Sequence, residues 1–239
     1  MISHPIKGVG YLWRGLRLIM QPGIRRFVFA PLAINILLFS SVIFFGASQF
    51  AILVDWLLSF VPDWLKWMEW LFWLIFGGSA LVVVFYTFTL IANLICAPFN
   101  GLLAESVERH LMGEKQNVES TWQQLLTDAG ASLIHEVKKL GYMLSRMLPL
   151  LLLFFIPGIN LVAPLLWFVF AAWLLALEYA DYPMANHGLH FPSVRRNLGQ
   201  KRVMALSFGS ATLFATMIPI VNLLVIPSAV AGATAMWVD

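Results

Sequence analysis

Four long uncharged stretches dominate the pattern of hydrophobic and polar positions along the chain. No Asp, Glu, Lys or Arg occurs within residues 27–54, 70–104, 147–177 or 203–238, which contain 28, 35, 31 and 36 residues. A helix needs about 20 apolar residues to cross the hydrocarbon core of a bilayer. Each stretch is therefore long enough to span a membrane, and the pattern predicts an all-α integral membrane protein.

The last two stretches are interrupted near their centres by a similar motif. The third contains Pro157 and Asn160, and the fourth contains Pro219 and Asn222. Proline removes a helical hydrogen bond, and asparagine can cap the exposed backbone groups. The motifs indicate either two kinked spanning helices or two helical hairpins that enter the membrane and turn back at 157–160 and 219–222.

The distribution of basic residues favours the hairpins. Segments 1–26, 105–146 and 178–202 carry five, five and four Lys or Arg, whereas 55–69 carries only Lys66. Lys and Arg accumulate on the cytoplasmic side of membrane proteins. Two crossings with two re-entrant hairpins place every basic segment on one side, and four crossings do not. We therefore predict that the first two stretches are long transmembrane helices and that the last two are re-entrant hairpins.

The remaining segments complete a single membrane domain over residues 1–239. In the first of them, Val9, Trp13 and Met20 recur at helical spacing, which indicates an amphipathic helix lying in the membrane interface. The segments that we predict are 1–26 for this helix and a basic motif, 55–69 for an amphipathic interfacial loop, 105–146 for extramembrane helices and 178–202 for a basic loop.

Composition agrees with a membrane protein and argues against several functions. The chain is 60% hydrophobic and 11% charged, whereas soluble domains carry about 25% charged residues. Its net charge of +3 does not indicate a nucleic-acid partner. Asp181, His187 and His190 lack the second cluster that a metal site needs, and no catalytic or phosphate-binding motif is present. We predict no enzyme activity, no cofactor and no bound metal.

Segment 21–26, with the sequence QPGIRR, is the strongest candidate for a binding site. Gly23 permits close approach of a ligand, backbone N–H groups at a helix start attract anions, and Arg25 and Arg26 add forked donors. Sulfate carries no proton and fits a site that only donates hydrogen bonds, whereas hydrogen phosphate also needs an acceptor. Two arginines at a helix end also commonly fix topology and bind lipid headgroups, so the residues alone leave both interpretations open.

Several polar residues within or beside the apolar stretches are candidates for a transport path. Single amides also serve as hydrogen-bonding groups between helices, which is the alternative for each of them. Two of these candidates, Glu105 and Glu108, carry a negative charge that is unfavourable beside an anion, and they either pair with Arg109 or gate the path. Small residues around Ser228 and Gly232 permit close helix contact, either within a hairpin or between subunits. The path candidates are Asn35, Asn93, Asn100, Glu105, Glu108, Asn160 and Asn222.

Taken together, these motifs resemble those of the CysZ sulfate permeases of Gram-negative bacteria. The resemblance extends from the N-terminal helix to Trp237. It is carried by QPGIRR at 21–26, APFNGLLAE at 97–105, Tyr179 with DYP at 181–183 and NH at 186–187, and GATAMW at 232–237.

The resemblance implies a protein of the bacterial inner membrane that passes sulfate into the cytoplasm for cysteine biosynthesis. It implies that Gly23, Ile24, Arg25 and Arg26 bind sulfate near the membrane surface. It also implies homo-oligomers of antiparallel protomers, each with two long transmembrane helices and two partly penetrating hairpins. In such an assembly the basic segments share one face of each protomer, but this arrangement does not fix which face is cytoplasmic. A non-transporting scaffold or a regulator of another transporter is the alternative function, and it predicts no intrinsic flux.

Overall fold

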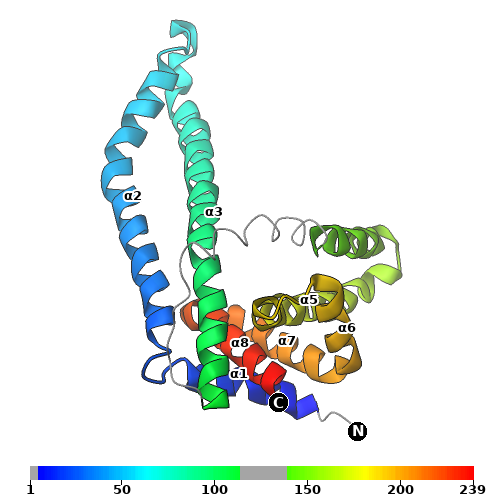
Figure 1. The fold of residues 1–239 in the computed structure, drawn as a ribbon. Coiled ribbons are helices and arrows are strands. Elements are labelled where there is room, and N and C mark those ends of the chain that lie inside the picture. The colour runs from blue at the N-terminus through cyan, green and yellow to red at the C-terminus, as the bar shows by residue number, and fades with distance from the viewer. Residues whose placement is uncertain (1–4, 114–138) are drawn as a thin grey trace. The chain divides into compact units, whose positions relative to one another are not determined.

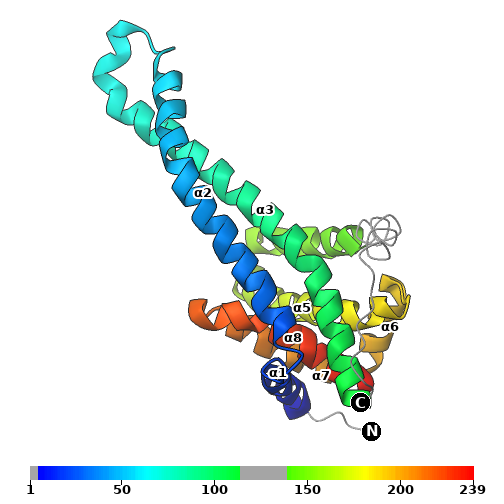
Figure 2. The same cartoon turned by 60° about the vertical axis from the view of Figure 1, so that its left-hand side comes forward.

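The computed structural model describes residues 5–113 and 139–239, and the regular structure of these residues is entirely helical, as predicted. The chain divides into two compact units, Phe29–Phe99 and Met1–Val28 with Asn100–Asp239 (Figures 1 and 2). Residues 139–152 are helical, and the other elements are α1 (Pro5–Leu18), α2 (Arg26–Leu58), η1 (Asp63–Met68), α3 (Glu69–Met112), η2 (Leu153–Phe155), η3 (Ile159–Leu161), α5 (Ala163–Asn186), α6 (Phe191–Gln200), α7 (Arg202–Thr216) and α8 (Pro219–Val238).

The unit Phe29–Phe99 contains most of the long helices α2 and α3, which run antiparallel. The rings of Phe39 and Phe88 lie 5.3 Å apart, and those of Phe50 and Trp73 lie 6.4 Å apart. In both pairs the two residues are nearly equidistant along the chain from Pro62, as an antiparallel pair requires. Proline cannot continue the helical hydrogen-bond pattern, and the 3₁₀-helix η1 begins directly after it.

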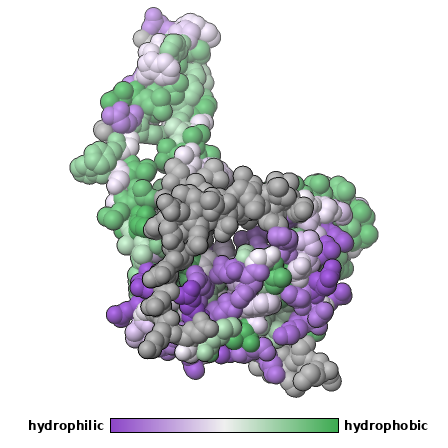
Figure 3. Space-filling model, in the orientation of Figure 1, coloured by the Kyte–Doolittle hydropathy of each residue, from purple (hydrophilic) through white to green (hydrophobic). Residues whose placement is uncertain are grey.

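The surface of the α2–α3 hairpin is apolar. Phe44 is 78% exposed and Phe45 is 68% exposed, and the side chains drawn over this hairpin in Figure 3 are mostly green. A soluble protein rarely exposes so large a contiguous apolar surface, and lipid is the environment that removes it from water. Four described helices have a segment long and apolar enough to cross a membrane: Arg26–Gly46, Trp70–Phe88, Ala163–Asn186 and Val221–Val238.

In the second unit, residues 139–152 and α5 form an antiparallel pair. Trp173 Nε1 donates a hydrogen bond to the Tyr142 hydroxyl at 3.2 Å, and the rings of Phe154 and Trp167 lie 6.1 Å apart. These pairs flank the helix break that was predicted at 157–160. The chain therefore turns back on itself at that break.

The turn itself is made by Pro157 and Gly158. Gly158 has a φ of +84°, a left-handed conformation that glycine adopts without steric cost. The short 3₁₀-helices η2 and η3 lie on either side, and the Asn160 N–H donates to the Ile156 carbonyl at 3.0 Å. Proline removes one backbone donor and glycine reverses the chain, so the two residues together end one helix and start the next.

The break between α7 and α8 lies before the position expected from the sequence. Ile218 is extended, with φ −96° and ψ 108°, as residues before proline prefer. Pro219 is then the first residue of α8, a position where its missing N–H costs nothing. The turn is therefore at Met217 and Ile218, and Asn222 lies in the first turn of α8 rather than at the tip.

Small residues allow α1, α5, α7 and α8 to approach one another closely. A Cβ atom on Gly15 would lie 2.0 Å from the Ser228 carbonyl oxygen, and one on Gly232 would lie 2.5 Å from the Tyr11 carbonyl oxygen. The backbones of α1 and α8 are therefore in direct contact. These small residues were expected to pack within a hairpin or between subunits, and the contact described here is instead with α1, a helix outside the hairpin.

Two other boundaries differ from the sequence expectation. Helix α3 continues to Met112, beyond the uncharged stretch that ends at residue 104, because the charged residues that follow are compatible with a helix. The predicted basic loop 178–202 contains the end of α5 and all of α6. Most of the predicted extramembrane segment, residues 114–138, lies outside the described residues.

Candidate functional site

The segment 21–26 forms a tight turn immediately before α2. Gly23 has a φ of +92°, and the Ile24 and Arg25 N–H groups both donate to the Gln21 carbonyl at 3.2 Å. Helix α2 begins only at Arg26, so Pro22 lies in the turn and not in the first helical turn. Within the described residues, the N–H groups of Gly23 and Arg26 have no backbone acceptor and remain available as donors.

Ile24 anchors this turn. Its side chain is fully buried, in the same hydrophobic cluster as Ile19, Leu103 and Phe208. Burial of an isoleucine side chain contributes roughly 2 kcal/mol relative to exposure. Ile24 therefore fixes the position of the turn, although its N–H is already used.

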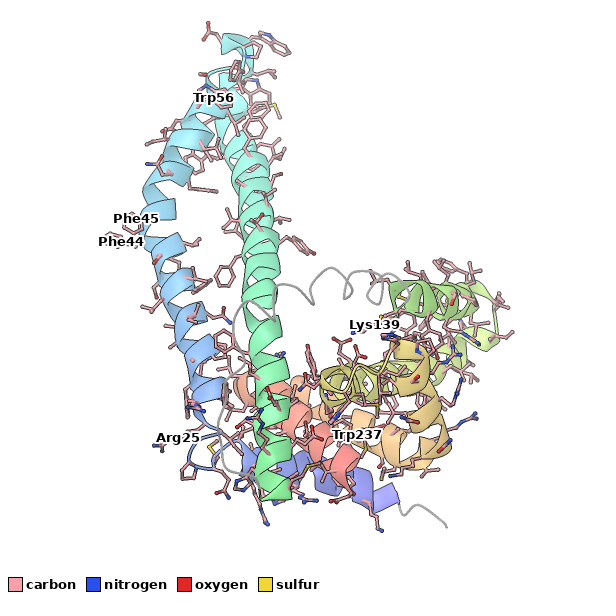
Figure 4. The ribbon with its side chains drawn as sticks, in the orientation of Figure 1. Arg25, Phe44, Phe45, Trp56, Lys139 and Trp237 are labelled. Carbon is pink, nitrogen blue, oxygen red and sulfur yellow. The ribbon has the colours of Figure 1, made fainter. Side chains whose placement is uncertain are left out.

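The two arginines of the turn are exposed. Figure 4 shows the Arg25 side chain extending from the loop that precedes α2. The Arg26 guanidinium lies 4.8 Å from the centre of the Phe27 ring, a cation–π contact that holds its aliphatic stem against the protein. Neither arginine forms an ion pair with a carboxylate in the part of the chain that the structure describes. The turn consequently exposes two positive charges that have no carboxylate partner among the described residues.

A second polar cluster lies where the end of α3 meets the end of α5. Asn100 Nδ2 donates to the Tyr182 hydroxyl at 3.3 Å, and Asn186 Nδ2 donates to the Gly101 carbonyl at 3.0 Å. Asn100 was a candidate for the path, and the structure gives it a partner on another helix. The two contacts join two of the stretches that carry the family resemblance, 97–105 and 179–187.

Both candidate glutamates of α3 are paired. Glu105 accepts a hydrogen bond from Arg109, one helical turn later, which is one of the two roles considered for it. Glu108 is 94% buried and its Oε1 lies 2.8 Å from Nε2 of His187 at the end of α5. The His187 ring in turn lies 5.8 Å from that of Trp237. A buried carboxylate requires such a partner, because desolvation of an unpaired charge is costly.

Lys139 connects the hairpin arm 139–152 to α5. Its Nζ lies 2.6 Å from Glu178 and 3.6 Å from Asp181, and the Lys139 residue is 95% buried (Figure 4). The sequence did not single out Lys139, because no motif relates it to carboxylates some 40 residues away. Three charged groups therefore meet at the point where the two helices converge.

The other path candidates lie on separate elements. Asn160 is exposed at the turn between η2 and α5, and Asn222 is exposed on α8. Asn35 is partly buried on α2, in the other unit. The side chain of Asn93 lies outside the described residues. No group of three or more His, Cys, Asp or Glu side chains suited to a metal ion occurs in the described ranges.

Comparison with known proteins places these features in a family. Residues 11–227 match the family described as "Sulfate transporter CysZ/Etoposide-induced protein 2.4". A protein of Pseudomonas syringae pv. tomato named "Sulfate transporter CysZ" is 44% identical over 238 residues, which cover 100% of this chain and 94% of that protein. Relatives with the same name in Pseudomonas paraeruginosa and Pseudomonas aeruginosa are 45% and 44% identical over 233 residues, covering 98% of this chain and 95% of each relative. The chain is an integral membrane protein that belongs to the sulfate transporter CysZ/etoposide-induced protein 2.4 family.

Proposed function

We propose that this chain carries sulfate across the bacterial inner membrane, as a channel or permease that supplies cysteine biosynthesis. The names of its relatives support the substrate. The observation that carries the proposal is the exposed pair Arg25 and Arg26, which has no carboxylate partner in the described chain and lies beside the unused Gly23 N–H.

The chemistry of the turn suits a fully ionised dianion. Arg25 and Arg26 supply two charges and several N–H donors, and the N–H groups of Gly23 and Arg26 add donors at the start of α2, where the helix dipole also attracts an anion. Ile24 contributes by holding the turn through its buried side chain. All of these groups donate, so an oxyanion that must itself donate a hydrogen bond loses one partner.

The polar cluster of α3 and α5 is the segment that we propose as part of the path. Arg109 offsets the charge of Glu105, which reduces the repulsion of an anion by that glutamate, and Glu108 is buried with its carboxylate in hydrogen-bond contact with His187. A passing sulfate competes with Glu105 for Arg109, so this pair is suited to act as a gate. Asn100, held by Tyr182, adds an amide that can donate to oxygen.

We further propose that the two C-terminal helical pairs penetrate the membrane only partly. Helix α7 has 15 residues, about 22 Å at 1.5 Å per residue, which is shorter than a hydrocarbon core of about 30 Å. Large apolar side chains are exposed beside the 157–160 turn, including Phe155 at 77% and Leu161 at 83%. Such a tip is stable in lipid only where its non-helical backbone is covered by protein or water. We also expect homo-oligomers, which the mass of the purified complex will test.

Binding of radiolabelled sulfate to the purified protein tests the capture site. Arg25→Ala combined with Arg26→Ala should weaken binding at least about tenfold, because each lost charge-assisted hydrogen bond contributes roughly 1.5–3 kcal/mol. Arg17→Ala combined with Lys201→Ala removes two exposed charges elsewhere and should leave the affinity unchanged. Equal affinities for the wild type and the 25/26 variant would refute the assignment.

Flux into proteoliposomes tests transport itself. The wild type should admit sulfate faster than empty vesicles, and Glu105→Gln should change the rate without changing the binding affinity at the 21–26 turn. Absence of flux by an intact oligomer would favour the scaffold or regulator function instead.

Spin labels can measure the depth of the hairpin tip in lipid nanodiscs. With Cys96 replaced by Ser, a label at Asn160→Cys should collide with oxygen more often than with a water-soluble nickel complex. A label at Ser59→Cys, at the polar end of the α2–α3 hairpin, is the control and should show the reverse. Accessibility of the Asn160 label to nickel equal to that of the Ser59 label would exclude the re-entrant arrangement.

A further inference from the structure

Four arginines gather along one groove that is separate from the 21–26 turn. The groove has a volume near 1280 Å³ and lies between residues 142–150, α5, α6 and the start of α7. The arginines are Arg146, Arg195, Arg196 and Arg202, and all four are exposed. No Asp or Glu occurs among the described residues that line the groove, and none of the four forms an ion pair there.

Tyr142 organises the basic end of the groove. The guanidinium of Arg195 lies 5.2 Å from the centre of its ring, and that of Arg146 lies 6.0 Å away. The Tyr142 hydroxyl accepts a hydrogen bond from Trp173 Nε1 at 3.2 Å, which fixes the ring. Two like charges are thus held near one aromatic ring, an arrangement that a bound anion would stabilise.

The groove changes from basic to apolar in the direction of the 157–160 turn. On the hairpin arm, Arg146 is followed by Pro149 and Leu150, and on α5 Phe170 and Leu166 lie progressively closer to the same turn. Leu166 is 40% exposed and therefore offers apolar surface to a bound molecule. The apolar wall beyond the arginines offers no favourable contact to a small inorganic anion, whereas an acyl chain can pack against it.

We propose that this groove binds one anionic phospholipid, with its phosphate among the four arginines and an acyl chain along the apolar wall. Forked guanidinium donors match phosphate oxygens, and lipid headgroups of a charged membrane are the anions most available beside an integral membrane protein. The site is distinct from the proposed sulfate site, because none of its residues belongs to the 21–26 turn or to the cluster around Glu105.

Native mass spectrometry of the detergent-purified full chain tests the proposal. The probes are dioleoylphosphatidylglycerol and dioleoylphosphatidylcholine, which carry the same chains and differ in net charge. We expect the first lipid to be retained at least about tenfold more strongly than the second. Arg146→Gln combined with Arg195→Gln should weaken its retention about thirtyfold, on the basis of roughly fivefold for each charge.

Two controls distinguish lipid binding in this groove from nonspecific attraction to positive charge and from binding at a site for free anions. Arg17→Gln combined with Lys201→Gln removes two positive charges outside the groove and should change retention less than about threefold. Glycerophosphoglycerol, which has the headgroup without chains, and inorganic sulfate should not displace the lipid at millimolar concentration.

The outcomes decide the proposal even if the arginine variant fails to fold. Equal retention of the two lipids by the wild type would overturn it, and so would an equal loss in the control variant. Displacement by glycerophosphoglycerol or sulfate would identify a site for free anions and would also overturn it. The proposal is supported if the wild type retains the anionic lipid preferentially and neither glycerophosphoglycerol nor sulfate displaces this lipid. Where a folded 146/195 variant is obtained, that variant alone should lose the retention.

Discussion

At the scale of single residues, the 21–26 turn shows what sequence can and cannot specify. The suitability of Arg25 and Arg26 for binding an anion follows from the chemistry of arginine alone. Chemistry alone does not show which backbone N–H groups are free, because the Gln21 carbonyl accepts hydrogen bonds from the Ile24 and Arg25 N–H groups only in this particular turn. The burial of Ile24 is equally unreadable from its neighbours, since it depends on partners such as Leu103 that are distant in sequence.

Gly23→Ala should weaken sulfate binding about fivefold. Alanine at a φ of +92° costs roughly 1–2 kcal/mol, which the chain would relieve by moving the turn and its donors. Gly199→Ala is the matched control, because Gly199 has no positive φ and open space where a Cβ would lie. Sulfate titration of both variants decides the matter, and unchanged affinity in Gly23→Ala would mean that this conformation is not needed.

Lys139→Met should lower the free energy of unfolding by about 3 kcal/mol. The substitution keeps the apolar stem but removes the positive charge that faces Glu178 and Asp181, and breaking a buried pair costs about 3–5 kcal/mol, reduced here by the partial exposure of the carboxylates. Thermal unfolding in detergent measures the effect. A triple variant that also carries Glu178→Gln and Asp181→Asn should recover part of the loss, and no recovery would contradict this account.

At the scale of helices, the length of the uncharged stretches predicted where helices form but not where each helix ends. The four apolar stretches all contain helices, because a buried backbone in lipid must satisfy its own hydrogen bonds. Helix α3 passes beyond its apolar stretch and α6 forms within the basic segment 178–202, since charge changes the environment of a helix without breaking it. The Pro-x-x-Asn motifs marked both breaks, but the 219–222 motif starts α8 and does not itself form the turn.

Gly209→Leu should prevent stable packing of α5 against α7. A Cβ at this position would lie 1.8 Å from the Ala172 carbonyl oxygen, and backbone cannot move aside as a flexible side chain can. We expect a loss of at least roughly 3 kcal/mol and little monodisperse protein in size-exclusion chromatography. Gly10→Leu on α1, where nothing lies within 4 Å, should elute as the wild type does, and identical behaviour of both variants would argue against this packing.

At the scale of the whole chain, sequence could not predict which distant segments meet. The stretches 97–105 and 179–187 were recognised separately, and only the structure shows Asn100 bonded to Tyr182 and Glu108 paired with His187. The contact between α1 and α8 was likewise outside the reach of periodicity. Both depend on the path of the chain between helices, which local pattern does not encode.

The α1–α8 contact should weaken in strong alkali. Burial, and then the hydrogen bond from Tyr11 to the Asp239 carboxylate at 3.0 Å, raises the pKa of Tyr11 above its usual value near 10. The folded state therefore holds this proton more tightly than the unfolded state, so the contribution to stability is complete below pH 10 and is lost as the pH rises through the folded pKa. Tm should fall more steeply above pH 10 in the wild type than in Tyr11→Phe. Tyr86→Phe, an exposed tyrosine in α3, should follow the wild type, and parallel curves for all three proteins would contradict the prediction.

The close approach of α1 to α8 also has a consequence for how the protein is made. Among the described helices, α1 is synthesised first, but α8, which covers α1 at Gly15, is synthesised after all the others. No helix made in between can serve as a substitute at Gly15, because its contact is with the backbone of Ser228 and Gly232. The bundle can therefore close only after α8 has been made, and until then the N-terminal segment must remain at the membrane surface, where its exposed residues Val9, Trp13 and Met20 contact the lipid.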